Sequence, residues 1–226
     1  LLSQKYKTMA EISAGVAHEI RNPLNSIAMN VQRLRLEFSP APDERAEYDE
    51  FIGIVLAEVE RLNRIVEQFL RLARFPDPRF RNASLPRLIR ETLEFLSPEI
   101  ESRGVNFDLR LDTVSDFLFD PDQIGQVLTN LVRNALDSMP GGGCLNIQGE
   151  SADTHYRVSV TDSGPGIPEA EAERVFEPFF STRPGGLGLG LAIVQRIVNE
   201  HGGSIRLENA PGGGARFIFA LPMRQA

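Results

Sequence analysis

The stretch His18-Glu19-Ile20-Arg21-Asn22-Pro23 lies inside a long pattern of apolar residues spaced three and four positions apart. That spacing is typical of a helix with one apolar stripe. At about 100° per residue, His18 points roughly 200° away from Val16 on the stripe. We therefore expect a helix that presents the imidazole to solvent, beside the carboxylate of Glu19 and the carboxamide of Asn22. The residues of the stripe are Ile12, Val16, Ile20, Leu24, Ile27, Val31, Leu34 and Phe38.

Pro23 lies within the same helical pattern. An interior proline removes a backbone hydrogen bond and costs about 3 kcal/mol where nothing compensates, so we expect the helix to loosen or bend there. A single histidine on a helix is more often a surface residue without a task. With the proline, however, residues 18–23 resemble the H-box of sensor histidine kinases, whose histidine accepts the γ-phosphate of ATP.

Two long helices are expected at the start of the chain, from about Ser3 to Phe38 and from about Asp43 to Arg74. The prolines of residues 39–43 separate them, and Asp43 is a plausible N-cap for the second. Two such helices form an antiparallel hairpin whose apolar stripes are too long for one partner helix to cover. We therefore predict a homodimer in which two hairpins make a four-helix bundle. The second stripe contains Phe51, Val55, Val59, Leu62, Val66 and Phe69.

The region beyond residues 75–79, which we interpret as a linker and hinge, alternates between helical and strand patterns. We expect an α+β sandwich with helices on one face of a mixed sheet. The domains are then residues 1–76, the hairpin, and residues 80–226. The expected helices are Leu85 to about Ser102, Asp122 to Met139 and Leu189 to His201; the expected strands are 105–111, 117–119, 145–147, 156–161, 204–207 and 216–221.

The bulk composition excludes several classes of protein. A formal net charge of −7 and a pI near 5.1 argue against broad nucleic-acid binding. No apolar run is long enough to span a membrane, and Cys144 is a single cysteine, which favours a reducing, cytoplasmic compartment. The chain begins in helical character, so we expect a missing upstream sensor region and a full-length protein that could be attached to a membrane.

The first polar cluster of the second domain is residues 130–137, on an expected helix. Asn130 and Asn134 are one turn apart and share a face. Their amide oxygens could ligate Mg²⁺ beside a triphosphate, because Mg²⁺ prefers oxygen ligands. The simpler alternative, two asparagines on a wet helix face, is favoured when this cluster is taken alone.

The second cluster, residues 162–168, directly follows an expected strand. Asp162 could accept a hydrogen bond from an exocyclic amine such as that of adenine, and Gly164 and Gly166 would let the backbone approach a flat base. An ordinary Gly/Pro turn is an equally good explanation of this stretch by itself.

The third cluster, residues 185–191, leads into the last expected helix. Gly186, Gly188 and Gly190 would expose backbone N–H groups at a helix N-terminus, which is suited to phosphate. It is not a P-loop, because no Gly-Lys-Ser/Thr follows.

In this order and spacing, the three clusters resemble the N, G1 and G2 boxes of the Bergerat-fold ATPases, a group shared by histidine kinases, gyrase, Hsp90 and MutL. Residues 176–180 look like the kinase F-box, part of the lid over the nucleotide. The set of five motifs most resembles nitrogen-regulator-type sensor kinases. The resemblance implies an ATP-dependent kinase that autophosphorylates His18, passes the phosphoryl group to an aspartate of a response regulator receiver domain, and also acts as a regulator phosphatase.

Carried over by residue, the resemblance implies that His18 is the phosphoacceptor, Glu19 its base or orienting acid, and Asn22 the residue that positions water for phosphatase action. Mg²⁺ would be held by Asn134 with Asn130 nearby. Leu187 departs from the family, which usually has Thr or Ser there. The ATP-binding set is Asn130, Asn134, Asp137, Asp162, Gly164, Gly166, Phe180, Arg183, Gly186, Gly188 and Gly190.

Two other functions compete with this hypothesis. A Bergerat-fold ATP hydrolase would carry a catalytic glutamate where Asn130 stands and would lack the hairpin. A non-catalytic dimeric scaffold would have no need of His18, Asn134 and Asp162 together.

Overall fold

A computed structural model describes residues 2–38, 40–41, 43–73, 77–182, 188–210 and 212–224 of the 226-residue chain. Side chains are described from residue 20 onward, except residues 64–65 and 67–73 and the gaps between those ranges. The chain divides into two compact units, residues 1–76 and 77–226, and each is described by itself. Among the described residues, no helix has the length and apolar character needed to cross a membrane.

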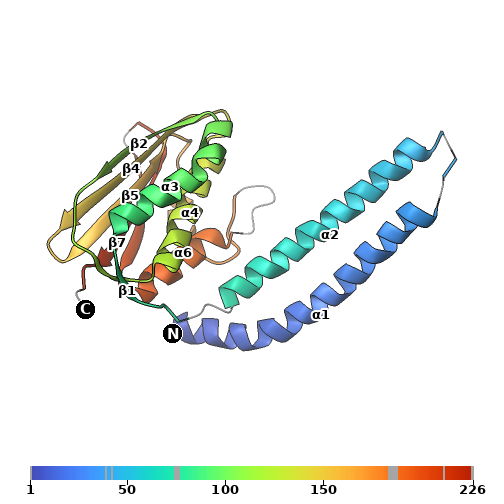
Figure 1. The fold of residues 1–226 in the computed structure, drawn as a ribbon, viewed down its shortest axis with the longest axis horizontal. Helices are drawn as coiled ribbons and strands as arrows, with labels where there is room; N and C mark the ends of the chain where they lie inside the picture. The colour runs from blue at the N-terminus through green and yellow to red at the C-terminus, as the bar shows by residue number, and fades with distance from the viewer. Residues whose placement is uncertain are drawn as a thin grey trace. The chain divides into compact units, whose positions relative to one another are not determined.

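The first unit is a hairpin of two helices, α1 (Leu2–Glu37) and α2 (Arg45–Ala73), which lie side by side (Figure 1). Both predicted helices are therefore confirmed, although α2 begins two residues after Asp43. The α1 helix continues through Pro23, so the proline does not end it. Near the turn, the Tyr48 hydroxyl donates a 2.6 Å hydrogen bond to the carbonyl of Leu34, which ties the two helices together.

Much of the apolar surface of the hairpin stays uncovered within one chain. Ile52, Val59 and Val66 recur every seven residues along α2 and are buried, as is Leu24 on α1. Other members of the predicted stripes remain exposed, so the buried seam is narrower than the sequence pattern. The exposed apolar side chains are Ile20, Ile27, Met29, Leu34, Leu36, Phe38, Phe51, Ile54, Val55 and Leu62.

The second unit is a two-layer sandwich built on a five-stranded mixed sheet of order β2-β4-β5-β7-β6. The β2–β4 pair is parallel and the other pairs are antiparallel. These strands are β2 (Val105–Leu111), β4 (Gly143–Ala152), β5 (His155–Asp162), β6 (Ser204–Asn209) and β7 (Ala215–Pro222).

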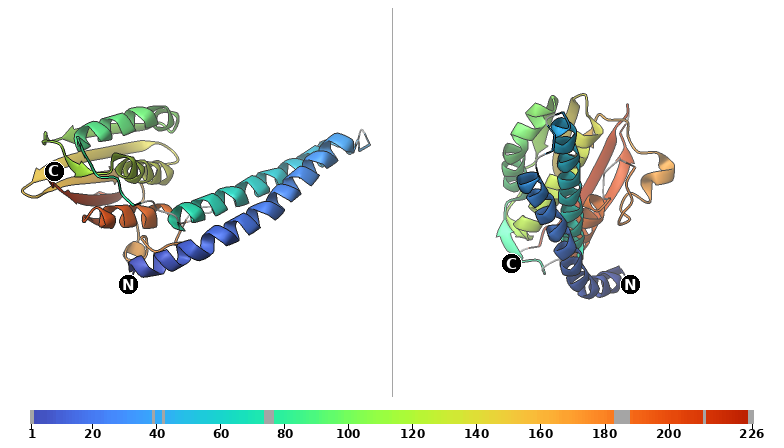
Figure 2. Two further views of the ribbon diagram at one scale, coloured as in Figure 1. Left: turned by 60° about the horizontal axis from the view of Figure 1, so that its bottom comes forward. Right: turned by 90° about the vertical axis from the view of Figure 1, so that its right-hand side faces the viewer.

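Helices α3 (Leu85–Ser102), α4 (Pro121–Ser138) and α6 (Gly190–Glu200) cover one face of this sheet (Figure 1), and Figure 2 shows the two layers from other sides. The predicted α+β sandwich is confirmed. Two short elements have no predicted counterpart: strand β1 (Arg81–Ala83), which pairs with β3 (Phe117–Phe119), and the four-residue helix α5 (Glu169–Ala172).

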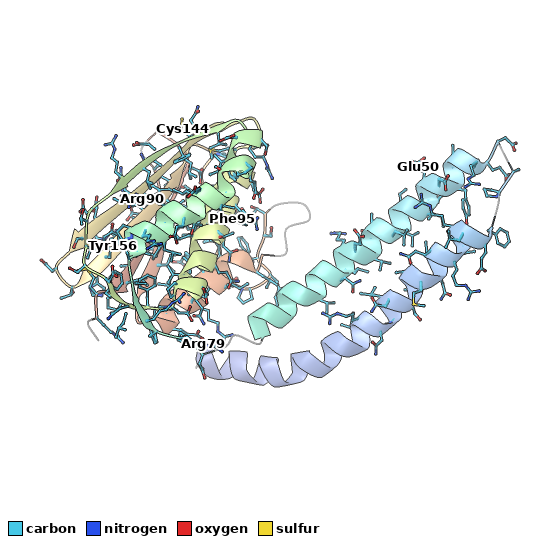
Figure 3. All side chains as sticks on the ribbon, in the orientation of Figure 1. Glu50, Arg79, Arg90, Phe95, Cys144 and Tyr156 are labelled. Atoms are coloured by element: carbon cyan, nitrogen blue, oxygen red, sulfur yellow. The ribbon has the colours of Figure 1, made fainter. Side chains whose placement is uncertain are left out.

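The base of the helical layer is fixed by a buried polar group, Asp120. Its Oδ1 accepts hydrogen bonds from the N–H groups of Asp122 and Gln123 and so caps α4. Its Oδ2 accepts one from the backbone of Arg79, which is labelled in Figure 3. The backbone N–H of Asp120 donates to Nε2 of buried His201, just after α6. This Asp120–His201 cluster joins the start of the unit to the ends of two helices.

Candidate functional site

Two neighbouring cavities of about 270 Å³ each open between α4, the loop after β5 and the start of α6. Both are lined by Asn134, Asp137 and Ile167, so they are parts of one cleft. Together they fall within the range of about 300–1,000 Å³ that is usual for small-molecule sites. Of the predicted ATP-binding residues, the lining contains Asn130, Asn134, Asp137, Asp162, Gly166, Phe180, Gly188 and Gly190.

Helix α4 supplies one wall of the cleft. The apolar face of α4 is buried, as its periodicity predicts. Asn130 and Asn134 lie on another face of the helix and line the cleft. The Asn130 amide donates a 3.4 Å hydrogen bond to the carbonyl of Gly190, so it also contacts the start of α6. The arrangement places two amide side chains beside a helix N-terminus.

Asp162, the last residue of β5, is 4% exposed and lies at the floor of the cleft. Its Oδ1 accepts hydrogen bonds from the backbones of Gly164 at 2.9 Å and Ala215 at 3.2 Å. A Cβ on Gly164 would stand 2.9 Å from that same oxygen, so a larger residue there would have to displace the carboxylate or the loop. These contacts fix the carboxylate in place.

Two residues that the sequence analysis missed hold the loop after Asp162. The Asn209 side chain accepts a hydrogen bond from the N–H of Ile167 at 3.0 Å and donates one to its carbonyl at 2.8 Å. The Ser163 hydroxyl accepts a hydrogen bond from the backbone of Cys144. Neither contact has a signal in the sequence, because each joins residues that are far apart along the chain: Asn209 and Ile167 are separated by 42 residues, and Ser163 and Cys144 by 19.

Gly188 packs against the backbone of Phe180 on the opposite wall. Its carbonyl accepts a 3.1 Å hydrogen bond from Phe179, and its φ of +63° favours glycine. A Cβ on Gly188 would fall 2.2 Å from the carbonyl oxygen of Phe180. No atom of the described residues, by contrast, lies within 4 Å of the position of a Cβ on Gly190, so contacts with the described residues do not explain that glycine. Arg183, Gly186 and Leu187 lie outside the described residues.

Two charged residues of the cleft, Asp137 and Arg133, have partners on α3 and just beyond it. Asp137 forms a 3.3 Å ion pair with Arg103, an interaction that the sequence analysis did not anticipate. Arg133 forms one of 3.1 Å with Glu99. No cluster of three or more His, Cys, Asp and Glu side chains that could hold a metal occurs in the described part of the chain.

The hairpin residues belong to the other unit. His18 and Glu19 lie within the helical span of α1, but their side chains are outside the described set. The Asn22 side chain is exposed, as predicted, and so is that of Asn25. The structure therefore gathers eight of the eleven predicted nucleotide residues in one cleft, leaves Gly164 beside it in the loop after Asp162, and leaves the predicted phosphoacceptor residues on a helix of the other unit.

Comparisons with known families match both units. Residues 8–78 match the model for the His Kinase A (phospho-acceptor) domain. Residues 119–225 match the model for the histidine kinase-, DNA gyrase B- and HSP90-like ATPases.

Individual proteins agree with these family matches. The sensor histidine kinase ZraS of Klebsiella oxytoca is 38% identical over 97% of this chain, which spans 47% of that relative. Full-length ShkA in complex with AMPPNP is 27% identical, with a TM-score of 0.76, over 96% of this chain and 46% of that chain. Histidine kinase ThkA in complex with the response regulator protein TrrA is 34% identical, with a TM-score of 0.70, over 98% of this chain and 64% of that one.

Proposed function

Because the chain belongs to the histidine kinase family, we propose that it is the ATP-dependent kinase portion of a two-component sensor, which phosphorylates His18 and passes the phosphoryl group to an aspartate of a response regulator. One observation carries the proposal. The cleft brings Asn130, Asn134 and Asp162 together with the first residues of α6, in a chain whose first helix holds His18.

Each wall of the cleft suits a different part of ATP. The carboxylate of Asp162 is held through Oδ1, so its other oxygen can accept a hydrogen bond from the adenine amine. The N-terminus of α6 offers backbone N–H groups and the positive end of the helix dipole to phosphate. The complex of full-length ShkA with AMPPNP, an ATP analogue, agrees with this assignment.

Mg²⁺ fits the donors at the same site. The amide oxygens of Asn134 and Asn130 are hard ligands, and Mg²⁺ usually takes one or two protein ligands and fills its shell with phosphate oxygens and waters. Asn134, which lines both cavities, is the main ligand in this proposal. When bound, the ion would offset negative charge on the phosphates.

The transfer chemistry uses the residues of α1. A neutral imidazole, with an ordinary pKa near 6.5, has a free lone pair at pH 7. A ring nitrogen of His18 forms the N–P bond while the bond from the γ-phosphorus to the bridging oxygen breaks and ADP leaves. Glu19 orients the ring or takes the proton that the imidazole loses. An aspartate oxygen of the regulator later displaces the imidazole from phosphorus.

The decisive experiment is to map the phosphorylated residue by mass spectrometry after incubation with Mg-ATP. We expect acid-labile phosphate on His18, and we expect His18→Ala to remove it while ATP still binds. His155→Ala, which changes an exposed histidine of β5, is the matched control and should label normally. Labelling that persists in His18→Ala contradicts the kinase proposal, and ATP hydrolysis without labelling would favour the hydrolase alternative.

Regulator dephosphorylation is a second activity, assigned here to Asn22, whose exposed carboxamide can orient a water. Asn22→Ala should lower phosphatase activity more than kinase activity. Asn25→Ala removes another exposed carboxamide of α1 and should leave both activities unchanged. Equal losses of the two activities in Asn22→Ala would contradict this role.

The proposed assembly is a homodimer through the hairpins. Exposed apolar side chains such as Ile27, Phe51 and Val55 gain a partner when a second hairpin completes a four-helix bundle. Sedimentation at micromolar concentration should show a dimer, and a monomer alone would contradict it. The response regulator in the ThkA complex agrees with a receiver domain as partner. A cytoplasmic location, a sensor region upstream and membrane attachment of the full-length protein are further proposals, and the nitrogen-regulator subgroup stays a prediction.

A further inference from the structure

The cleft contains a guanidinium that none of the functional assignments above uses. Arg133 stands on α4 between Asn130 and Asn134, three residues after the one and directly before the other. It lines the same cavity as both asparagines, Gly188 and Gly190. The side chain therefore lies where α4 faces the start of α6.

The charge balance of the cleft gives this arginine a role. Among the lining residues that the structure describes, Arg133 is the one cationic side chain, whereas Asp137 and Asp162 are acidic. Asp137 is already paired with Arg103, and Asp162 receives two backbone hydrogen bonds. A polyphosphate brings several negative charges into this cleft, and a protein cation near them offsets part of that charge.

The geometry of Arg133 leaves its anion-binding edge available. The Nε atom donates to Oε2 of Glu99 at 3.1 Å. Within the described part of the chain, its two terminal nitrogens have no acceptor. Arginine binds phosphate best through paired N–H groups, so a guanidinium held at Nε can offer both terminal nitrogens at once.

We infer that Arg133 is a nucleotide-binding residue that contacts the phosphates of ATP, with Glu99 as the residue that orients it. This inference rests on the proposed function and adds a specificity role, which is preference for nucleotides with several phosphates. Glu99 belongs to α3 and Arg133 to α4. The alternative explanation of the ion pair is therefore purely structural: it holds the two helices together.

The test measures binding of ATP and AMP to the full chain by displacement of a fluorescent ATP analogue. In Arg133→Gln we expect the ratio of ATP affinity to AMP affinity to fall about tenfold, as for one charge-assisted hydrogen bond at a partly exposed site. Arg110→Gln is the matched control. It also removes one charge from an arginine paired with a carboxylate, Asp108, but on edge strand β2, outside the cavity lining.

Glu99→Gln separates the two explanations. It can still accept a hydrogen bond from Nε while it removes a negative charge near the phosphates, so we expect the ATP to AMP ratio to stay the same or rise. If Arg133 only ties α3 to α4, Arg133→Gln must weaken ATP and AMP binding alike, and Glu99→Gln must leave the ATP to AMP ratio unchanged. Unchanged discrimination in Arg133→Gln overturns the inference although the kinase proposal stands, whereas a wild-type chain that does not bind ATP overturns the kinase proposal itself.

Discussion

Removal of the Asp120 side chain should destabilise the second unit without changing any residue that lines the cleft. Its carboxylate accepts three hydrogen bonds, from the N–H groups of Asp122 at 2.9 Å, Gln123 at 3.1 Å and Arg79 at 2.7 Å. Loss of an N-cap costs about 0.5–2 kcal/mol, and an unpaired, partly buried N–H costs about 1–3 kcal/mol more. We expect Asp120→Ala to lower the free energy of unfolding by about 2–4 kcal/mol, a large share of the usual total of about 5–15 kcal/mol.

The measurement is urea unfolding followed by circular dichroism, because the chain has no tryptophan for fluorescence. Calorimetry should assign the change to the transition of residues 77–226. Asp122→Ala is the matched control, since it also removes an acidic group from the first turn of α4. Its side chain is 92% exposed and its contact with Arg81 is 3.7 Å long, so it should cost less than about 0.5 kcal/mol. Equal losses in the two variants would refute the reasoning.

Further predictions concern three buried polar residues. Burial lowers the pKa of His201 in the folded chain, so its contribution to stability should be complete above about pH 6.5 and be lost as the pH falls through the folded pKa. Urea unfolding measured at several pH values from 5 to 8 should therefore show a free energy of unfolding that depends less steeply on pH in His201→Gln than in the wild-type chain. Burial raises the pKa of Tyr156 to about 12, so the stabilising effect of the neutral phenol should be lost only as the pH rises above about 10. An absorbance titration should find one tyrosine that ionises at higher pH than the others, and this step should be missing in Tyr156→Phe. That variant also leaves the carbonyl of Asp112 without its 2.9 Å hydrogen bond and should cost about 1–3 kcal/mol in urea unfolding. Asp162→Asn should weaken ATP binding more than about tenfold in binding titrations. It should also reduce the ratio of ATP affinity to ITP affinity, because the amide can donate a hydrogen bond to the carbonyl of the inosine base. An unchanged ratio would contradict adenine recognition by Asp162.

The fold followed from the sequence where periodicity was strong. The α3 helix and the β2 and β3 strands match their predicted bounds, because each has a sharp apolar pattern flanked by turn residues. The β1 strand was missed because its residues, Arg81, Asn82 and Ala83, are not an apolar run, unlike the three apolar residues of the equally short β3. The α5 helix was missed for a similar reason: its four residues contain none that is buried.

The site followed from the sequence only where its residues are close along the chain. Asn130 and Asn134 share a helix face, so their common direction was predictable from spacing. The clamp of Asn209 on Ile167 depends on the order of the strands, and the pairing of Arg133 with Glu99 depends on how α3 packs against α4. Long-range contacts of this kind leave no local pattern, so only the structure could identify them.

The bond from Arg79 to Asp120 has a structural consequence. The Asp120 carboxylate ties residue 79, near the start of this unit, to the first turn of α4, and the Asp120 backbone N–H ties the same point to His201 at the end of α6. The entering segment and two helices of the cleft thus meet at one anchor point, which contains no residue of the cleft lining.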